Sequence, residues 1–169
     1  MLTALHRATW RAAYRELLPP GTLDDLDSPE VQRAWADTVE GGATVLLATE
    51  GHDPVGFVVA GPAPPGEIAA ADGTLPADAP QVGLVSTLLV EPRWGRRGHG
   101  GRLLAAASAA LRECGAVRGI AWVPAEDPAS LSFYRRAGWD PDGTVRTLDA
   151  GGRTLREVRL TGSLDLTVR

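Results

Sequence analysis

The sequence of 169 residues contains a single cysteine, Cys114, and no lysine, so all 17 of its basic side chains are arginine. One thiol excludes an intramolecular disulfide framework and a cysteine-cluster metal site. The absence of an ammonium side chain excludes a P-loop of the G-x-x-x-x-G-K type, Schiff-base catalysis and a pyridoxal enzyme. Several common enzyme classes are therefore removed before any motif is considered.

The chain also lacks an excess of positive charge and any long apolar stretch. Its formal net charge is −4 and its pI is about 5.4, so neither nucleic acid nor an anionic membrane is expected as a main partner. No run approaches the roughly 20 apolar residues of a membrane span, and no targeting segment is visible. We expect a single cytoplasmic domain over residues 1–169, because 44% hydrophobic residues suffice for a core.

Hydrophobic periodicity predicts both helices and strands. Apolar positions spaced by three and four residues indicate helices, and β-rich runs bounded by Gly or Pro indicate strands. The region 61–80 is rich in Pro, Ala and Gly and too long for a simple turn, so it is either a functional flap or a mobile insertion. The order of the predicted helices and strands along the chain implies an α/β (α+β) fold with one sheet covered by helices. The predicted helices are residues 2–17, 29–39, 102–114 and 128–138, and the predicted strands are 44–49, 55–60, 82–90, 117–123, 139–148 and 154–161.

The most informative segment is Leu88–Leu104, where a glycine- and arginine-rich loop joins a strand to a helix. The first N–H groups of a helix have no partner within it, and the helix dipole adds about half a positive charge there. Glycines let the backbone close on a phosphate, and arginines add charged donors. The alternative is a tight connection with solvated arginines. The candidate phosphate-binding residues are Gly98, Gly100, Gly101, Arg96 and Arg97.

This segment resembles the coenzyme A site of the GCN5-related N-acetyltransferases (GNAT). Its run L-L-V-x-P-x-x-x-x-x-G-x-G-x-x-L-L is similar to the strand and pyrophosphate loop of that family, written Q/R-x-x-G-x-G/A. Gly98 and Gly100 match the two small positions. Gly95 stands at the Gln/Arg position, a departure for which Arg96 or Arg97 would compensate.

A second block, Phe133–Trp139, reads F-Y-R-R-A-G-W and is similar to the family's F-Y-x-x-x-G-F. The resemblance covers roughly residues 2–161 and implies a mixed, mostly antiparallel sheet flanked by helices. Family members normally have a strand before the first helix. That strand is missing here from the predicted pattern, which would leave one sheet edge unprotected.

The resemblance implies acetyl transfer from acetyl-CoA to a primary amine of a small molecule or peptide, by direct attack within a ternary complex and without a metal. The backbone of Leu88 and Val90 would pair with the pantetheine arm, and an N–H near Leu89 would bind the thioester oxygen. Tyr134 would act as the catalytic acid for the departing thiolate; without the resemblance it would be a core aromatic. The implied cofactor-binding residues are Leu88, Leu89, Val90, Gly95, Arg96, Arg97, Gly98, His99, Gly100 and Gly101.

The base that deprotonates the amine is not identified by the pattern. Many family members carry a glutamate on the central strand at the place where this sequence has Leu84. Ser86 or Thr87 could hold a water, and Glu67 or Asp72 could reach the site from the Pro-rich region. Deprotonation through water is the default expectation.

Three side chains receive structural expectations. His99 is expected to offer its backbone N–H with its ring in solvent, Cys114 to be a buried inert thiol, and Tyr134 to aim at a neighbouring strand. A spacing of four places the core face of the last helix at Ala129, Phe133 and Ala137.

A second function remains open, a non-catalytic acyl-CoA-binding or regulatory protein on the same fold. Gly95, Leu84 and the missing first strand favour it, whereas Tyr134 argues against it. An unrelated phosphate binder is disfavoured because lysine and a metal-ligand cluster are absent. A homodimer is also compatible with the sequence.

Overall fold

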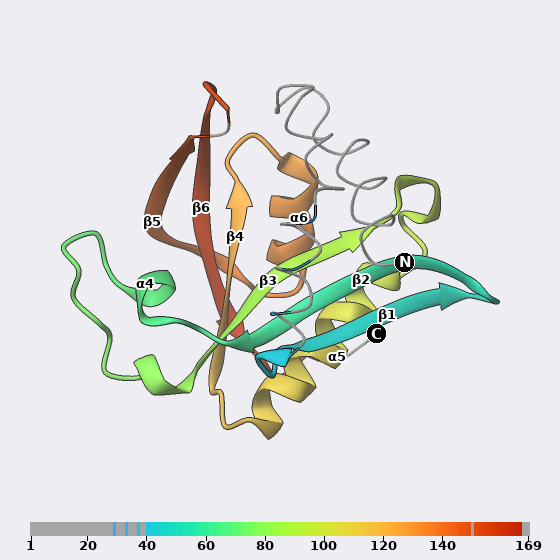
Figure 1. The fold of residues 1–169 in the computed structure, drawn as a ribbon, viewed down its shortest axis with the longest axis horizontal. Coiled ribbons are helices and arrows are strands. Elements are labelled where there is room, and N and C mark those ends of the chain that lie inside the picture. The colour runs from blue at the N-terminus through green and yellow to red at the C-terminus, as the bar shows by residue number, and fades with distance from the viewer. Residues whose placement is uncertain (1–28, 30–32, 34–36, 38–39, 150, 167–169) are drawn as a thin grey trace.

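The computed structural model describes residues 29, 33, 37, 40–149 and 151–166 (Figure 1). The first predicted helix, residues 2–17, lies outside this part of the chain, and the described residues of the second one are helical. The strands are β1 (Thr44–Glu50), β2 (Asp53–Pro62), β3 (Val82–Val90), β4 (Arg118–Pro124), β5 (Asp140–Asp149) and β6 (Thr154–Ser163). The helices are α4 (Pro65–Ile68), α5 (His99–Glu113) and α6 (Pro128–Arg136), with 3-10 turns η2 (Ala79–Gln81) and η3 (Pro92–Trp94).

The six strands form one sheet in the order β1-β2-β3-β4-β6-β5. All neighbours are antiparallel except β3 and β4, which run parallel. The helix α5 packs on β1, β2 and β3, and Figure 1 shows α6 beside β4. The predicted mixed, mostly antiparallel sheet flanked by helices is confirmed. Among the described helices, none combines the length and apolar character of a bilayer span.

The helix α5 buries the apolar stripe that its sequence predicts. Leu103, Leu104, Ala107 and Leu111 lie in the main hydrophobic cluster together with side chains of the sheet. Cys114, however, is exposed. The prediction of a buried thiol was wrong because Cys114 is the C-cap, where the chain leaves the helix and turns away from the core.

The connection between β2 and β3 is a packed segment that contains α4. Pro64 and Pro65 fix the start of this short helix, and Ile68 is buried against Val82 of β3 and Ile120 of β4. The segment carries Glu67, which this packing holds over the sheet next to the junction of β3 and β4. The part of this region that contains α4 is therefore packed on the sheet, and a function for the region stays a prediction.

Candidate functional site

The loop between β3 and α5 adopts a conformation that only some residues accept. After η3 the chain passes through Arg96 at φ 61° and Gly98 at φ 83°, both in the left-handed region. Gly98 is the N-cap of α5, and its carbonyl accepts the first helical hydrogen bond, 3.0 Å from the Arg102 nitrogen. Arg97 lies over the Trp94 ring at 4.7 Å. The turn thus places two arginines directly before the N-cap of α5.

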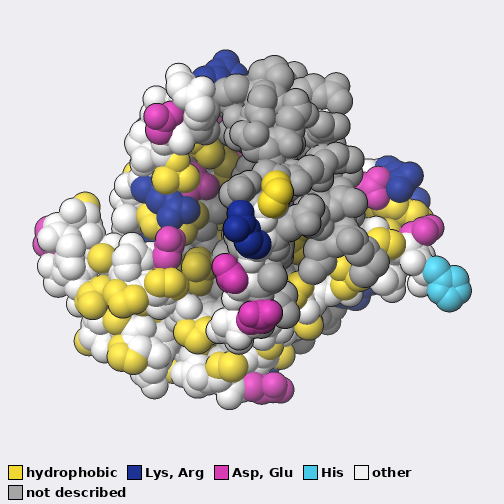
Figure 2. Space-filling model, in the orientation of Figure 1, with side chains coloured by type: hydrophobic (Ala, Val, Ile, Leu, Met, Phe, Trp, Pro, Cys, Tyr) yellow, Lys and Arg dark blue, Asp and Glu magenta, His cyan; other side chains and the backbone are white. Residues whose placement is uncertain are grey.

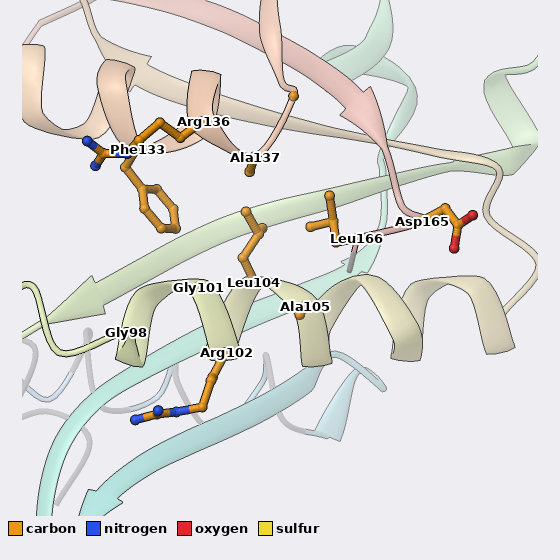
Figure 3. A pocket seen from close by; sticks show the side chains of 11 residues that line it. Gly98, Gly101, Arg102, Leu104, Ala105, Phe133, Arg136, Ala137, Asp165 and Leu166 are labelled. Carbon is orange, nitrogen blue, oxygen red and sulfur yellow. The ribbon is translucent and has the colours of Figure 1, made fainter. Parts of the chain in front are cut away.

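The N-terminus of α5 borders a cavity of about 760 Å³ between α5 and α6 (Figure 3). Gly98, Gly101 and Arg102 line it from one side, and Phe133 and Arg136 line it from the other. A Cβ at Gly101 would meet nothing within 4 Å, so its backbone is open to a ligand. The N–H groups of the first helical turn make this cavity suited to phosphate, and Arg102 and Arg136 add positive charge at its border.

Gly100 has a different role from its neighbours in the loop. A Cβ at this position would lie 3.2 Å from the Phe133 ring, closer than ordinary packing allows. The absence of a side chain therefore lets α6 approach the start of α5. The glycines of this loop therefore have two roles. Gly98 and Gly101 leave the backbone exposed, whereas Gly100 allows the two helices to pack closely.

The parallel strands β3 and β4 separate after a short contact. Only three residues of β3 pair with β4, the last being Leu84 with Ile120. Ser86 is the extra residue where the register with β2 shifts, because Val59 pairs with Thr87 and Ala60 with Val85. Beyond this bulge, β3 keeps its pairing with β2 but has no pairing with β4. A bulge bends and twists a strand, which accounts for the separation.

The strand residues predicted to bind the cofactor lie in this separated part of β3. Leu88 and Val90 pack against the main cluster below α5, whereas Leu89 points to the opposite face, beside Phe57. Their pairs on β2 are Val58, Phe57 and Gly56. The other backbone edge has no strand partner among the described residues, so an extended ligand arm can pair along it.

A second, smaller cavity of about 150 Å³ lies where β3 and β4 separate. Ser86 contributes a hydroxyl that donates to the Val59 carbonyl at 3.3 Å. Of the two acidic candidates from the Pro-rich region, Glu67 lines this cavity, whereas Asp72 is exposed and caps the Thr74 N–H at 2.9 Å. The lining residues are Glu67, Leu84, Val85, Ser86, Trp122, Arg146 and Glu157.

Arg146 of β5 is shared by two carboxylates at this cavity. Its Nη1 donates to Glu67 at 2.9 Å and its Nε donates to Glu157 at 2.6 Å. The guanidinium also lies over the Trp122 ring, 4.2 Å from the centroid. Figure 2 shows basic side chains flanked by acidic ones in the region over β5, β6 and α4. Among the described residues that line this cavity, one positive and two negative charges give an excess of negative charge.

Arg159 of β6 extends the network and ties α4 to the sheet. It is buried, donates to Asp142 at 2.6 Å, and donates to the carbonyls of Glu67 and Ala69 at 3.1 and 2.9 Å. Sequence reasoning missed Arg146, Glu157 and Arg159. For Glu157 and Arg159, the available signal was the run R-E-V-R-L at residues 156–160 of a predicted strand, because charged residues two positions apart share one face of a strand.

Tyr134 is buried at 6% exposure within the main cluster, which also contains Val85 of β3 and Ala121 of β4. Its ring lies 5.1 Å from that of Phe133 and 5.5 Å from that of Trp139. The expected core face of α6 was partly wrong, because Ala129, in the first turn after Pro128, is exposed and Tyr134 is part of the core. The expectation that Tyr134 faces the neighbouring strands agrees with its cluster.

His99 does not place its ring in solvent, contrary to the expectation. The side chain is buried at 2% exposure, between Arg102 of the same helix and Glu50 of β1. The reason is its position as the first residue of α5, whose start lies against the sheet edge. Within the described residues, no three His, Cys, Asp or Glu side chains gather as a metal site requires.

A glycine-rich helix start suited to phosphate lies beside a strand edge that no described strand pairs with, as the resemblance to the acetyltransferases predicts. Residues 5–139 match the acetyltransferase (GNAT) family, and the chain belongs to that family. No curated protein sequence matches the chain. The family assignment confirms the resemblance carried by the loop and by the F-Y block.

Solved structures share the fold. One is ribosomal-protein-alanine N-acetyltransferase from Brucella melitensis, with 23% identity, a TM-score of 0.70, and coverage of 96% of this chain and 91% of that chain. PaiA N-acetyltransferase from Thermoplasma acidophilum, in complex with coenzyme A, has 14% identity, a TM-score of 0.68, and coverage of 96% and 90%. YncA from Salmonella typhimurium, with its cofactor acetyl-CoA, has 17% identity, a TM-score of 0.68, and coverage of 99% and 89%.

Proposed function

We propose that residues 1–169 form one acetyl-CoA-dependent N-acetyltransferase domain that acts on a primary amine of a small molecule or peptide. One observation carries this proposal. The edge of β3 with which no described strand pairs runs from the glycine loop at the start of α5 to the small polar cavity beside Ser86. Acetyl-CoA bound along this edge would place its thioester at the small cavity, which an amine can enter.

The described residues fit coenzyme A. Bound acetyl-CoA would supply an activated acetyl thioester. The N–H groups at the start of α5 would bind the pyrophosphate, with Arg96 and Arg97 of the same loop nearby. Leu88 and Val90 would hold the pantetheine amides through their backbone, and an N–H near Leu89 would polarise the thioester carbonyl. The remaining loop contributors are Gly95, Gly98, His99, Gly100 and Gly101.

The small cavity would receive the acceptor amine. Glu67 and Glu157 share the single guanidinium of Arg146, so an arriving ammonium finds unbalanced negative charge. A volume of about 150 Å³ admits an amino group and a few neighbouring atoms. The amine would lose its proton to a water at Ser86, with Glu67 or Glu157 as the final proton acceptor. The acid for the departing thiolate would be Tyr134.

The proposal is tested by two measurements on the full chain. We expect acetyl-CoA to raise the thermal midpoint, because a ligand held at a hundredfold excess over its Kd stabilises the native state by about 2.7 kcal/mol. We then expect thiol release when acetyl-CoA is mixed with members of a panel of amines, amino acids and peptides.

The two readouts separate the open alternatives. Binding of acetyl-CoA without turnover on any amine would favour the non-catalytic acyl-CoA-binding protein. A folded protein that shows no thermal shift at millimolar acetyl-CoA would contradict the cofactor assignment itself. Calorimetry with coenzyme A serves as the independent check on binding.

A further inference from the structure

His99 is a buried, polar side chain at the edge of the proposed phosphate site that the proposed chemistry does not use. Its Nδ1 lies 3.0 Å from Nη2 of Arg102. Its Nε2 lies 2.9 Å from Oε1 of Glu50, close enough for an ion pair but without the alignment of a hydrogen bond. The imidazole therefore lies between the last residue of β1 and the first turn of α5.

The partners define which ring nitrogen carries the proton. A guanidinium can only donate, so Nδ1 of His99 must accept from Arg102. The proton of a neutral ring then sits on Nε2 and faces the carboxylate of Glu50. The three side chains therefore lie in a row, in which the Arg102–His99 contact is a hydrogen bond and the His99–Glu50 contact is a close charged approach.

Arg102 stands at the rim of the phosphate site. Its Nη1 lies 3.6 Å from the position that a Cβ on Gly98 would occupy, so the guanidinium lies beside the N-cap of α5 at the border of the cavity of about 760 Å³. A long arginine on a helix surface normally samples several rotamers, which makes its ordering costly. A fixed acceptor at Nη2 reduces that cost and leaves other N–H groups of the guanidinium for a ligand.

We propose that Glu50 and His99 are positioning residues that hold the guanidinium of Arg102 against a phosphate group of coenzyme A. The inference rests on the proposed function, since it names a determinant of affinity in the same site. Coenzyme A carries a pyrophosphate and a 3′-phosphate, and both present the oxyanions that a guanidinium binds.

The first experiment measures the Kd of coenzyme A and of dephospho-coenzyme A, which lacks the 3′-phosphate, for wild type and Arg102→Ala. We expect Arg102→Ala to raise the Kd for coenzyme A by about 10- to 100-fold, as loss of a charge-assisted hydrogen bond does. An equal loss with both ligands identifies the pyrophosphate, and a loss confined to coenzyme A identifies the 3′-phosphate. Arg156→Ala, an exposed arginine of β6, controls for the change in net charge.

The second experiment tests the positioning role with a double-mutant cycle. His99→Leu should raise the Kd severalfold in the wild-type background but have no effect in the Arg102→Ala background. His99→Asn, which returns an acceptor near Nδ1, should restore most of the affinity. Glu50→Gln changes a half-exposed side chain with little risk to folding, and it should raise the Kd in the same direction as His99→Leu.

The outcomes separate this inference from the proposed function. Failure of the wild type to bind coenzyme A would overturn the proposed function, and the inference with it. Normal wild-type binding with an unchanged Kd for Arg102→Ala on both ligands would overturn the inference alone. Equal losses for His99→Leu in both backgrounds would overturn the positioning role, because they would indicate a general structural effect.

Discussion

The indole of Trp139 occupies space that two facing glycines leave open. Gly119 of β4 pairs with Gly162 of β6, and a Cβ on either residue would overlap the indole. Trp139 is fully buried, and its Nε1 donates to the Ser163 carbonyl at 3.0 Å. Trp139 thus joins the end of α6 to β4 and β6. This packing is possible because Gly119 and Gly162 have no side chains.

Gly162→Ala should lower the free energy of unfolding by about 1–3 kcal/mol, the usual effect of overpacking a core. The added methyl must displace the Trp139 ring, which has no exposed side toward which to move. Urea unfolding followed by tryptophan fluorescence would measure the change. Gly66→Ala in α4 is the matched control, because its Cβ meets nothing within 4 Å. Equal stabilities of the two variants would contradict this packing argument.

Tyr134→Phe tests the acid assignment. The change keeps the ring contacts with Phe133 and Trp139 and removes only the hydroxyl. General acid catalysis supplies about 10²–10⁴-fold, so kcat should fall toward the low end of that range, since water substitutes in part. The Kd for acetyl-CoA should change little, because the phosphate contacts lie elsewhere.

The control for this variant is Tyr134→Ala, which also removes the buried ring and should destabilise the protein strongly. Wild-type kcat for Tyr134→Phe on a good acceptor would refute the acid role. It would then leave Tyr134 as a core aromatic, and the family assignment would stand.

At the scale of elements, the turn into α5 is the segment whose backbone conformation matters most for the proposed cofactor binding. Gly98 adopts φ 83° as the N-cap, so the first N–H groups of α5 face outward. The strand β3 supplies the other half of the site because the bulge at Ser86 ends its pairing with β4. Two local backbone irregularities therefore shape the proposed site.

Gly98→Ala should lose about 1–2 kcal/mol of stability, because a left-handed conformation is strained for a residue with a Cβ. It should also lose most of the thermal shift with acetyl-CoA, since the methyl obstructs the approach of a phosphate to the backbone. Gly73→Ala provides a matched control with the same strain, φ 84°, in an open turn outside both cavities. If both variants retained the full thermal shift, the glycine loop would not be the phosphate site.

At the scale of the whole molecule, the parallel strands β3 and β4 are paired at one end of the sheet, the closed end, and separate at the other, the divided end. The closed end is held where Arg118 of β4 donates to Asp78 at 2.6 and 3.0 Å and to Thr161 of β6 at 3.2 Å. The divided end contains the small cavity and the edge of β3 with which no described strand pairs. The closed end thus fixes the geometry on which the divided end depends.

This closed end gives the protein a pH-dependent contribution to stability. The hydrogen bond from Arg118 lowers the pKa of Asp78 below its ordinary value of 3.8. A carboxyl whose pKa is lower in the folded state stabilises the protein above its unfolded pKa, and this stabilisation is lost as the pH falls through the folded pKa.

Asp78→Asn should therefore cost up to about 1 kcal/mol near pH 7, a small value because the pair is partly exposed to solvent. The difference from wild type should shrink as the pH falls below about 4, where the unfolded carboxyl becomes protonated. Urea unfolding at several pH values would measure it. A difference that stayed constant down to the lowest pH of native folding would contradict the ion-pair origin.

The sequence by itself determined the elements and the family. The apolar stripe of α5, the β-rich runs and the glycine loop are local patterns, because helix and strand periodicity depend on neighbouring residues. The loop and the F-Y block also carried the resemblance that the family match over residues 5–139 confirms. The cofactor-binding and acid residues remain predictions that the experiments above test.

Only the tertiary structure decided which distant side chains meet. Glu67, Arg146 and Glu157 come from three separate elements, and no local pattern links them. The burial of His99 depends on Glu50, which is 49 positions earlier, and the exposure of Cys114 depends on where α5 leaves the sheet. Charge pairing and burial are set by contacts between elements, and such contacts exist only once the chain has folded.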